Sequence, residues 1–400
     1  MTLLAVISLL SVISQTAQLK IDSLITSAMD NGVFSGAVVE VVRDKGEPFL
    51  KAWGHRCVVP EEEAMDVSTI FDVASISKCV STTIVALKLC EQGLINPDAY
   101  VKEYIPDFAP YVQRPPRKGS AQYIRNFIPE TDDITVRQLL YHTSGLPAGR
   151  LSYKLRETHG PDYSDLEDYL FHDATRINKP GTKYRYSCLG FLVLQSIIER
   201  VSGKDLCELA DSLIFKPLGM KDTYYFRDTA PDELIGRIAP TETELDSLGE
   251  WHCLRGTVHD PLAREFCHGN AGNAGVFTTA SDLAKISLAI LGKGQYKGVR
   301  ILKSESVRMM TRPDKFSGRT AGWDSNEREK MEWTGELWEK GRVICHTGFT
   351  GPSIMIDTKS DTVVILMCSR LHPQPLKPQK GQMTLMDVRR ALSDIVASDL

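Results

Sequence analysis

Apolar runs near the two ends of the chain predict β-strands. Residues 36–42 (GAVVEVV) and 48–55 (PFLKAWGH) are rich in β-branched and aromatic side chains, and Asp44-Lys45-Gly46 between them is a hairpin signal. A second group comprises residues 342–348 (RVICHTG), 352–357 (PSIMID) and 362–368 (TVVILMC), with a turn at 359–361. We therefore expect antiparallel strands at both ends of the chain.

Helical periodicity dominates between these strand groups and flanks them. The expected helices cover residues 20–31, 188–201, 281–291 and about 383–397. The pattern predicts an α/β fold in which one antiparallel sheet, built from both termini, is flanked by helices and carries an inserted, mainly helical region. We place the α/β subdomain at 20–95 and 335–400 and the helical subdomain at 96–334, with irregular excursions at 110–131 and 312–340.

Composition is that of an ordinary globular protein. The chain has 400 residues, of which 42% are hydrophobic and 24% charged, and its net charge is −4. Basic residues cluster in Arg114-Pro115-Pro116-Arg117-Lys118, but the neighbouring Pro and Gly indicate a solvated loop. We therefore predict no nucleic-acid partner, and nothing in the composition indicates an oligomeric state.

The N-terminus carries an apolar stretch of signal-peptide length. Residues 3–13 (LLAVISLLSVI) are too short to span a membrane, no Lys or Arg precedes them, and a small-residue cleavage point follows Ser14. Residues 1–19 are thus a signal peptide or an N-terminal extension. The protein would be secreted or periplasmic if residues 1–14 are a signal, and cytoplasmic otherwise. No later run is long enough for a transmembrane helix.

The chain contains nine cysteines, which could form disulfides or bind a metal. None lies in a Cys-x-x-Cys pair and most sit inside apolar runs, a pattern typical of reduced thiols. The segment holding His252-Cys253, His259, Asp260 and Cys267-His268 has metal-ligand residue types, but its spacing matches no standard zinc motif. We predict no metal and no cofactor.

The stretch 71–94 (FDVASISKCVSTTIVALKLCEQGL) places candidate chemistry at the start of an apolar helix. If 75–92 is helical, Ser75 and Lys78 lie one turn apart on the same face, and Ser75 sits where free N–H groups favour negative charge. Apolar neighbours such as Val80 and Ile84 can bury the lysine stem, and desolvation would lower its pKa so that it can accept a proton. The competing interpretation makes Ser75 an N-cap and Lys78 a solvated side chain.

Two further segments carry related signals. Tyr186 stands in a turn before an apolar helix in residues 180–204 (PGTKYRYSCLGFLVLQSIIERVSGK), and His346-Thr347-Gly348 lies on a strand. In this order and at these separations the three elements resemble the serine β-lactamase and penicillin-binding-protein superfamily: Ser-x-x-Lys, Tyr-x-Asn and Lys/His-Thr-Gly. The tyrosine is similar to that of the class C and esterase branch. Residues 134–147 and 258–284 also look family-like, so the resemblance covers about 20 to 395.

The resemblance implies a role for each matching residue. Ser75 would attack a carbonyl and form an acyl-enzyme, while Lys78 and Tyr186 share the proton as general base and acid. The oxyanion would be held by the backbone N–H groups of Ser75 and Phe349. Residues 346–348 (His346, Thr347 and Gly348) would line the rim and bind a substrate carboxylate or carbonyl.

This sequence departs from the family pattern at two positions. Cys188 replaces the Asn of Tyr-x-Asn, whose amide would hold a substrate carbonyl, and His346 replaces the Lys of Lys-Thr-Gly. Both changes argue against efficient β-lactam hydrolysis. An unperturbed histidine titrates near pH ~6.5, so binding of carboxylate substrates at His346 would weaken as the pH rises through that region.

Two other motifs are interpreted as structural. In residues 134–147 (ITVRQLLYHTSGLP), Thr135 and Gln138 fit a capping box, and His142 is either a structural histidine, which we favour, or a cleft residue. The run 269–275 (GNAGNAG) lacks the Lys-Ser/Thr of a P-loop and the strand–helix setting of a dinucleotide fold, which excludes a nucleotide site.

The sequence as a whole favours a serine hydrolase that cleaves a small-molecule or peptide-like ester or amide. Muramyl-peptide-type cell-wall compounds are one candidate substrate class. The alternatives are a carboxylesterase or acyltransferase on small acyl substrates, and a catalytically inactive binding member of the superfamily. The chain contains neither a Gly-x-Ser-x-Gly elbow nor His-Glu-x-x-His, which argues against α/β-hydrolases and zinc hydrolases.

Overall fold

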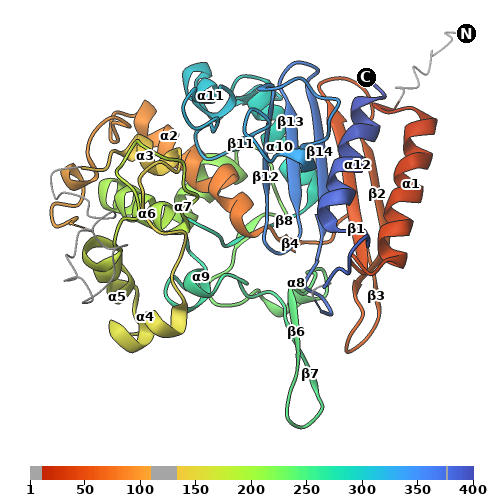
Figure 1. The fold of residues 1–400 in the computed structure, drawn as a ribbon, viewed down its shortest axis with the longest axis horizontal. Helices are drawn as coiled ribbons and strands as arrows, with labels where there is room; N and C mark the ends of the chain where they lie inside the picture. Colours follow the sequence, from red (N-terminus) through yellow and green to blue (C-terminus); the bar gives the residue numbers. More distant parts are fainter. Residues whose placement is uncertain (1–10, 110–132, 375–376) are drawn as a thin grey trace, which may run out of the picture.

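A single antiparallel sheet joins the two ends of the chain. The computed structural model describes residues 11–109, 133–374 and 377–400 (Figure 1). The sheet has the order β11-β12-β13-β14-β1-β2-β3. Its strands are β1 (Gly36–Arg43), β2 (Phe49–Cys57), β3 (Glu63–Ala64), β11 (Asp324–Ser325), β12 (Val343–Thr347), β13 (Ser353–Asp357) and β14 (Thr362–Cys368). The predicted α/β fold with a sheet built from both termini is therefore confirmed.

The centre of the sheet is where the two termini meet. Strand β1 pairs with β2 on one side and with β14 on the other, so Val39 lies opposite both Lys51 and Leu366. Every residue of β14 is buried. Because successive side chains of a strand point to opposite faces, Val38 joins the core shared with the helical region, while Val39 joins the core under α1 and α12.

Helices cover both faces of this sheet. Helices α1 (Gln15–Asp30) and α12 (Leu385–Ala397) pack against each other and lie over one face, as Figure 1 shows. Helix α10 (Ala280–Leu291) packs on β1 and β14 from the other side. Helix α1 begins earlier than the predicted residue 20, because the Ser14 side chain accepts a hydrogen bond from the Ala17 N–H and caps it there.

The remaining elements are short apart from α6 (Cys188–Ser202) and α2 (Thr83–Glu91). The other helices are α3 (Val136–Leu140), α4 (Ser152–Thr158), α5 (Tyr163–Asp168), α7 (Leu206–Ala210), α8 (Asp232–Ile235), α9 (Pro261–Glu265) and α11 (Ser304–Thr311). The other strands are β4 (Phe71–Asp72), β5 (Tyr224–Tyr225), β6 (Glu242–Leu245), β7 (Trp251–Leu254), β8 (Val276–Thr278), β9 (Gln295–Tyr296) and β10 (Val299–Arg300). Helices α2 to α7 form the helical region on the left of Figure 1, and strands β4 to β10 form three small sheets apart from the main one.

Some predictions fall outside the described residues. These are the excursion at 110–131, with its basic cluster Arg114–Lys118, and most of the N-terminal apolar stretch. The second excursion, 312–340, is irregular apart from β11 and a 3-10 turn at Glu332–Thr334. Among the described residues, no helix combines the length and the apolar character needed to cross a membrane.

Candidate active site

Ser75 lies in a tight turn between strand β4 and helix α2. A 3-10 turn (Ala74–Ile76) is followed by a π-helical turn (Lys78–Thr82), so the α-helix itself begins only at Thr83. The expected single helix over 75–92 is thus divided into three parts. At the start of this segment Ala74 has a φ of 45°, a left-handed conformation that an alanine adopts only under constraint.

Asp72 supplies that constraint. Its buried carboxylate accepts hydrogen bonds from the Ala74 N–H and the His259 N–H, both at 2.8 Å. Its carbonyl oxygen accepts the Thr350 hydroxyl at 2.7 Å. One residue therefore fixes the turn that carries Ser75 against two other segments of the chain.

Lys78 points back at Ser75 from inside the protein. Its side chain has no exposed surface. The Nζ atom donates hydrogen bonds to Ser75 Oγ at 2.9 Å and to the Asn273 carbonyl at 2.7 Å, and lies 5.1 Å from the centre of the Tyr186 ring. The structure thus brings the three catalytic candidates together, and the solvated-lysine interpretation is wrong.

The protonation of the Lys78–Tyr186 pair differs from the expectation for a desolvated lysine. Burial disfavours the Lys78 ammonium, but the electrostatic influence of Cys188 and Tyr186 outweighs it, so the pKa of Lys78 is raised above its usual value. For Tyr186, burial raises the pKa to about 12 against the lowering influence of Lys78. At neutral pH the pair is therefore an ammonium beside a neutral phenol, and the expected lowering of the lysine pKa is wrong.

Tyr186 stands at the entrance of helix α6. Ser187 caps that helix by accepting the Gly190 N–H, which fixes the preceding residue. The Tyr186 ring packs 4.5 Å from the His142 ring, centre to centre. Its hydroxyl lies close enough to Lys78 and Ser75 for both side chains to lower the pKa of Tyr186 through hydrogen bonding, so a proton can pass among the three groups.

A cavity of about 300 Å³ opens above Ser75. The residues that line it are Ser75, Tyr184, Tyr186, Arg319, Asp324, Trp333, His346, Thr347 and Phe349. Five of these are among the site residues predicted from the sequence. Gly348 instead lines a neighbouring cavity. Cys188 is not among the lining residues, although its thiol is close enough to influence Lys78.

His346 reaches this cavity but cannot act as the expected titrating group. Its Nδ1 lies 2.9 Å from the Thr347 carbonyl oxygen, and only 6% of the residue is exposed. Burial lowers the pKa of His346 to about 3, assisted by the positive charges of Arg319 and Lys78. The expected titration near pH ~6.5 is therefore wrong, and His346 is neutral throughout the physiological range.

Arg319 supplies the positive charge that His346 lacks. This side chain is 1% exposed, and its guanidinium donates to Asp324 Oδ2 at 3.1 Å and to the Tyr184 hydroxyl at 3.3 Å. Arg328 also donates to Asp324, at 2.5 Å. Two arginines share one carboxylate, so the group keeps one net positive charge at the cavity wall. Arg319 lies in an irregular segment without a motif, so its sequence gives no signal of this role.

The end of β12 passes close to the nucleophile turn. A Cβ atom at Gly348 would lie 2.6 Å from the Val73 carbonyl oxygen, so only glycine permits this approach. In the described part of the chain, neither the Ser75 N–H nor the Phe349 N–H donates to an acceptor. Both amides that the resemblance assigns to the oxyanion are thus available.

His142 behaves as the structural histidine that we favoured. Its ring is fully buried between Tyr186 and Phe191, and Nδ1 accepts the Ser187 N–H at 3.0 Å. Burial also lowers the pKa of His142 well below its ordinary value. A neutral ring in this position fixes the backbone beside Tyr186.

The other candidate motifs do not form a site together. His252 bonds to Asp246 and His268 to Asp228, while His259 pairs with Glu242, so the histidines of the possible metal segment have separate partners. The run 269–275 packs against the π-helical turn that follows Ser75. There the Gly272 carbonyl accepts a hydrogen bond from the Thr82 hydroxyl at 2.7 Å.

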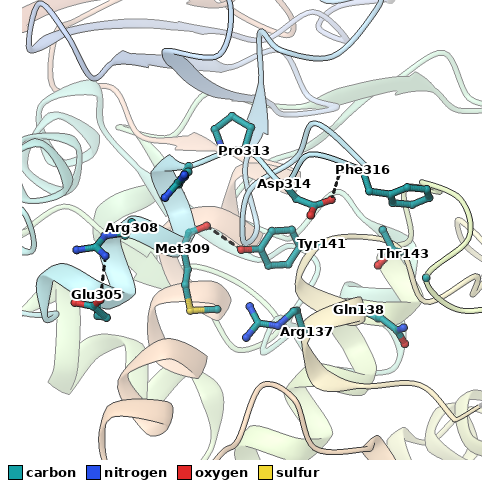
Figure 2. Close-up of a pocket in the computed structure, with 12 residues that line it drawn as sticks. Arg137, Gln138, Tyr141, Thr143, Glu305, Arg308, Met309, Pro313, Asp314 and Phe316 are labelled. Carbon is teal, nitrogen blue, oxygen red and sulfur yellow. Dashed lines mark hydrogen bonds and ion pairs between the residues drawn. The ribbon is translucent and has the colours of Figure 1, made fainter.

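A larger cavity, of about 520 Å³, lies between α3 and α11 and contains none of the predicted site residues (Figure 2). Two of its arginines are already paired. Arg137 bonds to Asp98 at 2.6 Å, and Arg308 bonds to Glu305 at 3.1 Å. The cavity above Ser75 is therefore the better candidate for chemistry.

Comparison with known proteins agrees with this geometry. Residues 21–385 match the beta-lactamase family. The chain is 28% identical over 380 residues to the N-acetylmuramyl-L-alanine amidase of Bacillus subtilis, covering 90% of this chain and 83% of that protein. It is 25% identical over 380 residues to a putative D-alanyl-D-alanine carboxypeptidase of Escherichia coli K12, covering 90% and 84%.

A solved structure supports the same fold. EstCE1, described as a hydrolase with promiscuous acyltransferase activity, superimposes with a TM-score of 0.71 over 95% of this chain and 99% of its own, at 18% identity. A sheet from both termini with a helical region beside it is the architecture of β-lactamase-type proteins. This chain belongs to the beta-lactamase family, as its match over residues 21–385 shows.

Proposed function

We propose that this protein is a serine hydrolase that cleaves an ester or amide bond through an acyl-enzyme on Ser75. The observation that carries the proposal is the 2.9 Å hydrogen bond between Lys78 Nζ and Ser75 Oγ beneath an open cavity. Nucleophilic catalysis needs a base within hydrogen-bond reach of the hydroxyl, and this pair has that geometry.

The proton has to move before Ser75 can attack. With Lys78 an ammonium and Tyr186 a neutral phenol, the pair must first release one proton to solvent. It can then accept the Ser75 proton as Oγ bonds to the carbonyl carbon, and return it to the oxygen or nitrogen that leaves. Water attacks the resulting acyl-enzyme, releases the acid and restores Ser75.

The transition state carries negative charge on the carbonyl oxygen. The Ser75 and Phe349 N–H groups are the proposed donors to that oxygen, since neither has an acceptor among the described residues. Lys78 lies beneath Ser75 and Arg319 lines the cavity, so their positive charges favour the same state.

The names of the relatives suggest the substrate class. Two relatives that align over 90% of this chain are named as an amidase of muramyl compounds and as a carboxypeptidase of D-alanyl peptides. We therefore propose muramyl-peptide-type amides as the first substrates to assay. If an alcohol replaces water in the second step, the same site becomes an acyltransferase, and if it cleaves small esters it is a carboxylesterase.

A fluorophosphonate probe tests this proposal, because it phosphonylates a serine hydroxyl that is activated as a nucleophile. Wild-type protein should be labelled on the peptide containing Ser75, and Ser75→Ala should not be labelled. Ser77→Ala is the matched control, since the Ser77 hydroxyl is buried and already accepts the Val276 N–H at 3.0 Å. An unlabelled wild-type protein, as expected of an inactive binding member, would refute the proposal.

A further inference from the structure

Two cysteine thiols meet at one carbonyl oxygen, and neither lines the cavity above Ser75. Cys57 is the last residue of β2, and Cys253 lies in β7. The Sγ atoms of Cys57 and Cys253 donate to the Val59 carbonyl oxygen, at 3.0 Å and 3.1 Å respectively. Both thiols are free in the structure. Because the two sulfur atoms contact the same oxygen, they are neighbours, although β2 and β7 are far apart in the sequence.

A buried histidine connects the two segments that carry these thiols. His372 accepts the Val58 N–H at Nε2, at 2.9 Å, and its Nδ1 lies 2.6 Å from the Thr243 hydroxyl. Thr243 stands opposite Cys253 in the β6–β7 ladder, and its hydroxyl lies 3.6 Å from the Cys253 sulfur. A chain of contacts therefore runs from the residue that follows Cys57 to Cys253 itself.

An ion pair joins the same two segments a second time. The Arg255 guanidinium donates to both carboxylate oxygens of Glu63, at 2.6 Å and 2.7 Å. Arg255 directly follows β7, and Glu63 begins β3. Two parallel hydrogen bonds between a guanidinium and a carboxylate fix orientation as well as distance. The native fold thus holds Cys57 and Cys253 side by side.

The two thiols differ in their access to solvent. Cys57 is 1% exposed, and burial raises the pKa of its thiol. Cys253 is half-buried, and it belongs to the β6–β7 hairpin, which projects from the body of the molecule in Figure 1. A small oxidant therefore reaches Cys253 first, and Cys57 is the neighbour that can complete the reaction.

We infer that Cys57 and Cys253 are a redox-active pair, which a small disulfide such as oxidised glutathione converts into an intramolecular disulfide. The Cys253 thiolate attacks one sulfur of the oxidant, which forms a mixed disulfide and releases one glutathione. The Cys57 sulfur then attacks the Cys253 sulfur and releases the second glutathione. The pair loses two protons and two electrons, and the two glutathione molecules carry them away. The new bond fastens the β6–β7 hairpin to β2 of the main sheet.

A purely structural role for the thiols makes a different prediction. Each S–H group would then only satisfy the Val59 carbonyl and hold the loop that follows β2. In that case oxidised glutathione would stop at an adduct on Cys253, and no bond to Cys57 would form.

Equilibration with reduced and oxidised glutathione tests the inference on the full chain. After acid quenching and alkylation, peptide mapping should show the Cys57 and Cys253 peptides cross-linked, and the intact protein should have lost the mass of two hydrogen atoms. The equilibrium constant for this disulfide should be at least tenfold larger in the folded protein than in urea, because the fold brings together residues that are far apart in the unfolded chain.

Two serine variants and a melting curve complete the test. Cys253→Ser should abolish the cross-link, whereas Cys207→Ser, at a half-buried cysteine of α7, is the matched control and should leave it unchanged. A disulfide that the fold favours also stabilises the fold. Oxidised wild-type protein should therefore melt at a higher temperature than reduced protein, and this difference should vanish in Cys253→Ser.

Three results would overturn the inference. They are a glutathione adduct on Cys253 without a cross-link, a disulfide between other cysteines instead, and an equal equilibrium constant in the folded and unfolded chains. None of these measurements uses the reactivity of Ser75, so they succeed or fail independently of the proposed hydrolase.

Discussion

At the scale of single residues, the shared proton of Lys78 and Tyr186 determines how activity depends on pH. Burial raises the pKa of Tyr186 to about 12, and the pKa of Lys78 is also raised. The fraction of protein in which this pair has lost one proton, and can accept the Ser75 proton, is therefore small at neutral pH. Below the pKa this fraction increases about tenfold for each pH unit. We predict that kcat/KM for a neutral ester still rises between about pH 7 and about pH 9.5.

Stopped-flow measurement of kcat/KM across that range checks the prediction. An ester with no ionisable group is used so that only the protein titrates, and stability is followed in parallel. A plateau reached below about pH 8 would contradict the assignment of an ammonium–phenol resting state.

His346 provides a second prediction at this scale. Since burial lowers its pKa to about 3, it stays neutral between about pH 5.5 and about pH 8.5. The KM of a carboxylate substrate should therefore not follow a histidine titration there, and His346→Gln should preserve the ratio of KM values for a matched acid and methyl ester. A change in that ratio with a midpoint near pH ~6.5 would contradict this prediction, because it would mean that His346 becomes protonated when the carboxylate substrate binds.

At the scale of elements, the approach of β12 to the nucleophile turn is the sensitive feature. Gly348→Ala would bring a Cβ atom within 2.6 Å of the Val73 carbonyl, so the strand end or the turn must shift. A misplacement of about 1 Å can cost on the order of 100-fold in rate, and we expect kcat/KM to fall by at least about tenfold.

Gly236→Ala is the matched control for this substitution. Gly236 has open space around its Cβ position and a φ of −62°, which any residue can adopt. Steady-state kinetics and circular dichroism on both variants decide the question. Unchanged kinetics for a folded Gly348→Ala protein would mean that the β12 end does not position the reaction.

Elements with strong patterns were predictable, and the nucleophile turn was not. Strands β1 and β14 follow from runs rich in β-branched residues, because those runs are buried at the sheet centre. Strand β2 is mostly only half-buried, and it is predicted by its aromatic residues and by the turn signal before it. The turn before this segment has Ala74 at positive φ, hydrogen-bonded to Asp72, and Asp72 is itself held by the distant residues His259 and Thr350. No local pattern encodes a contact of that kind.

At the scale of the whole molecule, the buried carboxyl group of Glu40 makes the free energy of unfolding depend on pH. This residue of β1 is 4% exposed, and burial raises its pKa from an ordinary 4.5 to about 7. Between these values the folded state binds more protons than the unfolded state. The free energy of unfolding therefore falls as the pH rises from about 4.5 to about 7, by roughly 2–3 kcal/mol from this group.

Glu40→Gln removes that titration while keeping the shape of the side chain. The variant should exceed the wild type in unfolding free energy at pH 8 and approach it near pH 4, and urea unfolding at both values measures the difference. An equal difference at the two pH values would mean that Glu40 ionises normally in the folded protein.

The site shows the same division between linear motif and tertiary assembly. Ser75, Lys78 and Tyr186 could be predicted as candidate site residues, because each lies in a short motif directly before or within an apolar helix. Arg319 could not, because its place at the cavity depends on contacts with Tyr184 and Asp324 that no motif in its own segment indicates. The subdomain boundaries at 95 and 335 stay a prediction.

The central claim is a covalent acyl-enzyme on Ser75, and trapping it is the most direct test. Protein is mixed with a slowly deacylating p-nitrophenyl ester, quenched in acid within the burst, and analysed by intact mass and peptide mapping. The account predicts a mass increase of one acyl group on the peptide containing Ser75, with a matching burst of nitrophenol and neither signal in Ser75→Ala. Turnover without any acyl adduct, or an adduct on another residue, would contradict it.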